Sequence, residues 1–92
     1  MRENEYVRFL RSRSLAEVSI RSALDYVSEF EKHLIGAGKN LESVDVSDVK
    51  QYASKLMAEK KNTMERFLAL ARYVYMGGLN EVFIYFTSIL GG

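Results

Sequence analysis

Glycine is the only strong helix breaker in this 92-residue chain, because the sequence contains no proline. All six glycines, at positions 36, 38, 77, 78, 91 and 92, lie outside the long stretches in which apolar residues recur at intervals of three and four. Such intervals place apolar side chains on one side of an α-helix, whereas a strand requires alternation. The sequence therefore predicts an all-α domain whose helices end at the glycines.

Capping residues and apolar spacing divide the chain into five expected helices. The first helix is expected from Asn4 to about Arg11, and the second from Glu17 to Ile35. The third is capped by Asp45, the fourth is capped by Asn62 and ends at Gly77, and the fifth runs from Glu81 to Leu90 with Asn80 as its cap. Because only Lys60 and Lys61 separate the third helix from the fourth, these two are expected to form a tight hairpin. The expected architecture is a compact bundle of four principal helices plus an apolar C-terminal fifth helix, in one domain covering residues 1–92.

Composition excludes several classes of protein. The chain has no cysteine and one histidine, His33, so neither a disulfide framework nor a cysteine- or histidine-rich metal site is expected. His33 lies in the last turn of its helix, where it complements the helix dipole, and no glycine-rich phosphate loop is present. We therefore expect no catalysis by this chain alone, and no cofactor or metal.

Membrane insertion and export are not expected either. The longest apolar run, Val82 to Leu90, is about half of the roughly 20 residues that cross a bilayer as a helix. The N-terminal sequence lacks the apolar region of a secretory signal. A cytoplasmic protein is the expectation.

Charge is distributed unevenly, although the net charge is only +1. Four arginines and one glutamate lie between Arg8 and Arg21, and five cations and two glutamates lie between Lys55 and Arg72. Both basic stretches lie at or just before expected helix N-termini, where backbone N–H groups and hydroxyls also bind phosphate. We expect the two stretches to lie beside one another and to bind duplex DNA, although exposed loops with a few cations are also common on helical domains.

Four segments in order resemble the core-binding domain of tyrosine recombinases of the phage-integrase type, which has a SAM-like helical fold. They are Phe9-Leu10, the run from Leu15 to Ile20 with the long helix after it, Val44 to Tyr52, and Thr63 to Tyr73, and together they cover about Glu5 to Met76. In that family the second and fourth helices face the major groove of DNA, and catalysis belongs to a separate C-terminal domain. The resemblance therefore implies a non-catalytic DNA-binding module that is the N-terminal part of a longer protein.

The same resemblance implies DNA contacts from particular side chains. They are Arg13, Ser19, Arg21, Lys60, Lys61, Thr63, Arg66 and Arg72. Arginines bind guanine edges or phosphates, whereas lysines and hydroxyls bind mainly phosphates. Arg72 has an alternative structural role beside Tyr73. Ala16, which stands where the family has a serine or threonine cap, and the low net charge depart from the family pattern.

The expected fifth helix carries too many apolar side chains for a helix with one face in water. We expect it to contact a second copy of the chain or a neighbouring domain through Phe83, Tyr85, Phe86 and Ile89. The alternative is that the domain buries these side chains in its own core. A second function, a protein-interaction or dimerisation module of the same fold with no DNA role, therefore remains open.

Overall fold

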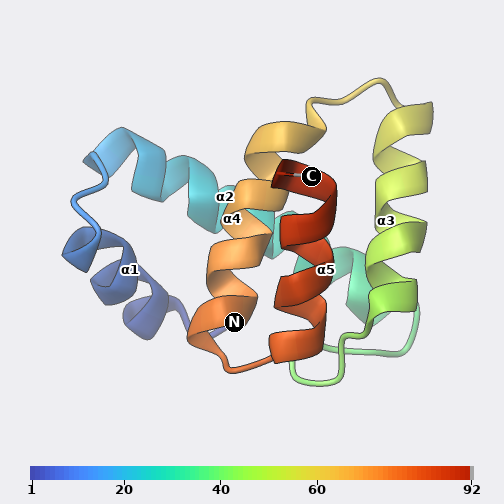
Figure 1. Ribbon diagram of the computed structural model, residues 1–92, viewed down its shortest axis with the longest axis horizontal. Coiled ribbons are helices and arrows are strands. Elements are labelled where there is room, and N and C mark those ends of the chain that lie inside the picture. Colours follow the sequence, from blue (N-terminus) through green and yellow to red (C-terminus); the bar gives the residue numbers. More distant parts are fainter. Residues whose placement is uncertain (92) are drawn as a thin grey trace.

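The computed structural model describes residues 1–91, and these residues form five α-helices and no strand (Figure 1). The helices are α1 (Glu3–Ser12), α2 (Glu17–Gly36), α3 (Val46–Ala58), α4 (Thr63–Met76) and α5 (Asn80–Gly91). The predicted all-α fold class is confirmed, and the helix limits agree closely with those expected from spacing and caps.

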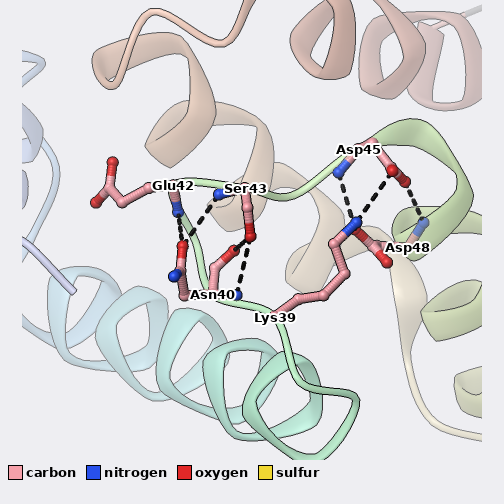
Figure 2. A network of polar contacts seen from close by, with 6 residues as sticks. All are labelled: Lys39, Asn40, Glu42, Ser43, Asp45 and Asp48. Carbon is pink, nitrogen blue, oxygen red and sulfur yellow. Dashed lines mark hydrogen bonds and ion pairs between the residues drawn. The ribbon is translucent and has the colours of Figure 1, made fainter.

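The predicted cap at Asp45 belongs to a polar network that precedes α3 (Figure 2). The side chains of Asp45 and Asp48 each accept a hydrogen bond from the other's backbone N–H, at 3.0 and 2.9 Å. The Lys39 ammonium group lies 3.0 Å from the Asp45 carboxylate and 2.7 Å from that of Asp48. The Asp48 N–H and Lys39 together lower the pKa of Asp45, while the hydrogen bonds to Asp48 and Asp45 raise the pKa of Lys39. In the loop between, the Asn40 side-chain oxygen accepts from the Ser43 N–H at 3.0 Å and turns the chain toward α3.

The two later caps have different outcomes. Asn62 is the cap of α4, since its side-chain oxygen accepts a hydrogen bond from the Met64 N–H at 3.0 Å. Asn80 is not a cap. The Phe83 N–H donates to the Leu79 carbonyl at 3.0 Å, so the helix already includes Asn80 and the prediction was wrong by one residue.

Each of the helices α1 to α4 is followed by a residue of positive φ, two positions after its last residue, and paired backbone hydrogen bonds close each last turn. After α2 and α4 this residue is Gly38 and Gly78, both at φ 77°. After α1 and α3 it is Ser14 at φ 62° and Lys60 at φ 56°. Because the left-handed region favours glycine, two of the four turns carry a backbone conformation that their side chains disfavour.

The core is organised around α4, which packs against both α2 and α5 (Figure 1). The first helix is attached to it by Tyr6, which is fully buried and whose hydroxyl donates to the Ala69 carbonyl at 2.6 Å. The Tyr6 ring packs edge-on against that of Tyr73, with centroids 5.2 Å apart. Burial raises the pKa of Tyr6 far above its usual value, so this hydroxyl remains a hydrogen-bond donor.

The prediction that α3 and α4 form a tight hairpin needs correction, because α5 lies between them. The chain reverses direction between α3 and α4, but α5 lies between the two helices (Figure 1). Phe86 in α5 is fully buried, and its ring centroid lies 5.7 Å from that of Phe67 in α4. An apolar fifth helix thus fills the space that a close α3–α4 pair would have occupied.

Candidate nucleic-acid interface

Two adjacent depressions lie on the surface formed by α1, α2, α4 and α5. The first, the α2–α4 groove, is lined by Leu15, Val18, Ser19, Ser22, Ala23, Tyr26, Glu65, Leu68, Ala69 and Arg72. The second, the aromatic pocket, has a volume of about 460 Å³ and is lined by Phe9, Arg13, Leu15, Arg72, Tyr75 and Phe83. Because Leu15 and Arg72 line both, the groove and the pocket form one continuous surface.

Two arginines mark the junction of the groove and the pocket. The Arg13 guanidinium lies over two aromatic rings, 4.9 Å from the centroid of Phe9 and 5.7 Å from that of Tyr75, which is a favourable cation–π geometry. Within residues 1–91, neither Arg13 nor Arg72 has a carboxylate at ion-pair distance. Both guanidinium groups are therefore available to an external anion.

Three of the predicted DNA contacts line these two connected depressions. Arg13 lines the pocket, Ser19 lines the groove, and Arg72 lines both. Arg72 also adjoins the Tyr6–Tyr73 pair, where its charge opposes the rise in the pKa of Tyr6, and the Tyr73 hydroxyl accepts a hydrogen bond from the Arg2 N–H at 2.8 Å.

Arg66, also predicted to contact DNA, is occupied inside the domain. Its Nε lies 3.2 Å from the Glu29 carboxylate, and a second guanidinium nitrogen donates to the Asn62 carbonyl at 2.9 Å. The guanidinium also covers the ring of Tyr26 at 4.8 Å from its centroid, and only 14% of the side chain is exposed. The Tyr26 hydroxyl donates to Glu65 at 3.0 Å, and this hydrogen bond raises the pKa of Tyr26. Arg66 thus fastens the first turn of α4 to the middle of α2.

Because of this attachment, the two basic stretches do not meet through the residues that were expected to bring them together. The predicted contacts at the start of α4 lie near the middle of α2 and not near its N-terminus; they are Lys60, Lys61 and Thr63. Lys61 pairs with the neighbouring Glu59 at 3.3 Å. Arg21 lines a different groove, between α1 and α2. Contrary to expectation, Arg21 and Lys61 line no common depression among those described, and Arg72 is the α4 cation that lies beside the start of α2.

The side chains predicted as an interface on α5 have four different environments. Phe86 is fully buried in the domain's own core, which corrects its assignment to a contact surface. Phe83 is half-buried in the wall of the aromatic pocket, and the half-buried Tyr85 ring lies 5.7 Å from the Lys50 ammonium of α3. Ile89 is 42% exposed and remains available. Ile84, which the prediction omitted, is the most exposed apolar side chain of α5, at 64%.

Sequence reasoning also missed Phe9, Tyr75 and Ser22 as surface residues of this site. Phe9 and Tyr75 recur with the apolar residues of their helices, a spacing that by itself indicates core positions. Their spacing carries a signal: Arg13 follows Phe9 by four residues, and Tyr75 follows Arg72 by three. Residues at these intervals share a helix face or the turn that follows it, so each aromatic ring was already placed beside an arginine.

No group of three or more metal-ligating side chains occurs in residues 1–91. His33 instead packs among aromatic rings, 5.1 Å from the centroid of Tyr52 and 6.4 Å from that of Phe30. Nor does any helix in the described residues have the length and apolar character needed to cross a membrane.

Comparison with known proteins gave one finding. The family model described as the N-terminal SAM-like domain of phage integrase matches residues 4–81. No curated protein and no solved structure matched the chain. The matched range includes every residue of the α2–α4 groove and most of the aromatic pocket, and it ends within the first turn of α5.

Proposed function

Because the chain belongs to the phage integrase N-terminal SAM-like domain family, we propose that it binds duplex DNA without catalysing a reaction. In this proposal the domain positions a separate catalytic domain of a recombinase on its DNA site, in the cytoplasm. The observation that carries the proposal is that Arg13, Ser19 and Arg72 line two connected depressions, and that neither guanidinium group has a carboxylate partner in the described residues. Such groups are the usual ligands of DNA phosphates.

The dimensions of α4 support the same proposal. The helix begins at Thr63, two residues after Lys61, and Arg72 lies nine residues further along. At 1.5 Å per residue these two positions are about 14 Å apart, which is close to the ~12 Å width of the major groove. Along the helix axis, the start of α4 and Arg72 are therefore separated by about the width of one major groove.

The proposal is tested by measuring the binding of a labelled duplex by fluorescence anisotropy between about 50 and 200 mM salt. The wild-type domain is expected to bind at low salt and to lose affinity steeply as salt rises. The double variant Arg13→Ala with Arg72→Ala is expected to bind more weakly. If each arginine neutralises one phosphate, the slope of log affinity against log salt becomes shallower by about 1.8.

A matched control removes the same charge elsewhere. Lys32→Ala with Lys50→Ala also deletes two cations, but neither residue lines the groove or the pocket, so both affinity and slope should change little. Circular dichroism establishes that both variants are folded. Failure of the wild-type domain to bind at low salt, or an equal loss in the control variant, would contradict the proposal.

A protein-contact role is the second candidate, and the exposed Ile84 and Ile89 on α5 favour it. In this alternative α5 contacts a second copy of the chain or a neighbouring domain. Sedimentation across a dilution series measures the association, which Ile84→Ser should weaken because it removes apolar area from the contact. A mass that stays monomeric at every concentration excludes the homodimer.

A further inference from the structure

We propose that the aromatic pocket binds one unpaired nucleotide of a DNA strand, with the base against the ring of Tyr75 and the phosphate between Arg13 and Arg72. The inference deepens the proposed function and rests on it, because the pocket adjoins the surface proposed to contact DNA. It assigns a preference for DNA that carries an unpaired base over fully paired DNA.

The pocket has the size and construction of a ligand site. Its volume of about 460 Å³ lies within the roughly 300–1,000 Å³ of small-molecule sites. Its walls include the rings of Phe9, Tyr75 and Phe83, which belong to three different helices. The ring centroids of Phe9 and Tyr75 are 6.1 Å apart, and those of Tyr75 and Phe83 are 4.9 Å apart. The Tyr75 side chain is 49% exposed, so a large part of it is open to a ligand.

The arginines indicate what kind of ligand fits. The Arg13 guanidinium, a flat group, already lies over the rings of Phe9 and Tyr75. A nucleobase is also flat and stacks on the same kind of surface. A base that replaced the guanidinium would break no ion pair within residues 1–91, and the displaced Arg13 would be free to join Arg72 on the phosphate.

Only an unpaired base can use these rings. In a duplex both faces of each base are covered by its neighbours, and extruding a paired base costs a few kcal/mol. A base that is already unpaired avoids this cost. The hydroxyls of Ser19 and Ser22 in the adjoining groove are then positioned for phosphates of the same strand.

An acidic peptide with an aromatic residue would meet some of the same groups. A DNA strand is favoured over such a peptide because the pocket shares Arg72 and Leu15 with the groove. One polyanion with regularly spaced phosphates can therefore follow both depressions. The peptide is therefore an outcome of the test and not part of the proposal.

The test compares two labelled duplexes that are identical except for one bulged thymidine. The wild-type domain is expected to bind the bulged duplex at least about fivefold more tightly, since stacking one base on an aromatic side chain typically contributes this much or more. Tyr75→Leu should abolish the preference, so that this variant binds the bulged and the paired duplex with equal affinity. Tyr85→Leu is the matched control, because Tyr85 also lies beside a cation, Lys50, but outside the pocket, and it should leave the preference intact.

A second measurement places the base in the pocket. The chain has no tryptophan, so the fluorescence of the Tyr75→Trp variant, excited where tryptophan absorbs and tyrosine does not, reports on this position alone. Single-stranded oligothymidylate should quench it, whereas thymidine monophosphate at the same nucleotide concentration should quench it far less, because it lacks the phosphates that the groove would hold. Equal quenching by both would overturn the assignment to a strand.

The outcomes separate this inference from the proposed function. If the wild-type domain fails to bind paired duplex, the proposed function fails. If it binds paired and bulged duplexes equally, or if Tyr75→Leu keeps the preference, the pocket inference fails while duplex binding stands. Quenching by a glutamate- and tyrosine-containing peptide but not by the oligonucleotide would also overturn the inference.

Discussion

Replacing Lys60 by glycine is expected to stabilise the domain, although the substitution removes a side chain. Lys60 follows α3 with φ 56°, and its N–H donates to the Met57 carbonyl at 3.1 Å. The next N–H, that of Lys61, donates to the Leu56 carbonyl at 3.0 Å. This pair of bonds requires the left-handed conformation at Lys60, which glycine adopts without steric cost.

The size of the effect follows from two opposing contributions. The left-handed conformation costs an L-residue roughly 1–2 kcal/mol, whereas glycine loses about 0.5–1 kcal/mol more backbone entropy on folding. The difference favours glycine by about 1 kcal/mol. For a domain of this length, that free energy corresponds to a rise in Tm of about 4–8 °C.

Comparison with Lys60→Ala isolates the backbone contribution. Both variants lack the ammonium group and the aliphatic stem, but alanine keeps the Cβ that disfavours positive φ. Urea unfolding should therefore show Lys60→Gly about 1 kcal/mol more stable than Lys60→Ala. The reverse change at the equivalent position after α4, Gly78→Ala, should cost about the same, because a Cβ there would meet no atom within 4 Å and only the φ of 77° opposes it.

The same pair of variants connects stability with binding. Lys60 is a proposed phosphate contact, and both substitutions remove one positive charge, so both should weaken duplex binding equally. Equal unfolding free energies of Lys60→Gly and Lys60→Ala would refute the assignment of strain to Lys60. A larger loss of DNA affinity in the glycine variant would refute the view that Lys60 acts through its charge alone.

Three further predictions concern the stability of the fold. Tyr6→Phe should lower the unfolding free energy in urea by about 0.5–1.5 kcal/mol, because it removes the buried hydrogen bond to the Ala69 carbonyl. Folding lowers the pKa of Asp45 below its usual value of 3.8, so the ionised carboxylate stabilises the folded state. This stabilisation is fully present above pH 3.8 and is lost as the pH falls through the lower pKa of the folded state. Urea unfolding of Asp45→Asn across the acidic range should therefore show a weaker loss of stability on acidification than the wild type. Phe86→Ala should cost about 3–5 kcal/mol in thermal or urea unfolding, whereas Ile84→Ser, on the exposed side of α5, should change the unfolding free energy by less than about 0.5 kcal/mol.

The parts of the fold that depend on neighbouring residues could be predicted from the sequence. The spacing of apolar residues predicted each helix, and the caps at Asp45 and Asn62 lie where the side-chain chemistry predicted them. These signals act over three to four residues, so they do not depend on the rest of the fold. The positive φ of Ser14 and Lys60 had no such signal, because the usual residue there is glycine.

The arrangement of the site depended on contacts between distant residues. Arg66 was predicted to face DNA, but its partner Glu29 lies 37 positions away, and nothing local indicates the pair. The same contact places the first turn of α4 beside the middle of α2, and so separates Lys61 from Arg21. Charge counts along the chain predicted that cations of the two stretches would lie side by side. Arg13 and Arg72 line one pocket, but Arg21 and Lys61 line no common depression among those described, and no local signal distinguishes these two pairs.

The position of α5 links the two candidate functions. Phe86 anchors α5 in the core, and Phe83, three residues earlier, forms a wall of the aromatic pocket, so the pocket exists only while α5 is docked. Ile84 follows Phe83 directly, which on a helix turns its side chain by about 100° toward the exposed side. A partner bound at Ile84 and Ile89 therefore need not cover the pocket, and a partner that removed α5 from the core would also remove the wall at Phe83. If protein contact and nucleotide binding both occur, Ile84→Ser should weaken only the first, whereas Phe86→Ala should weaken both.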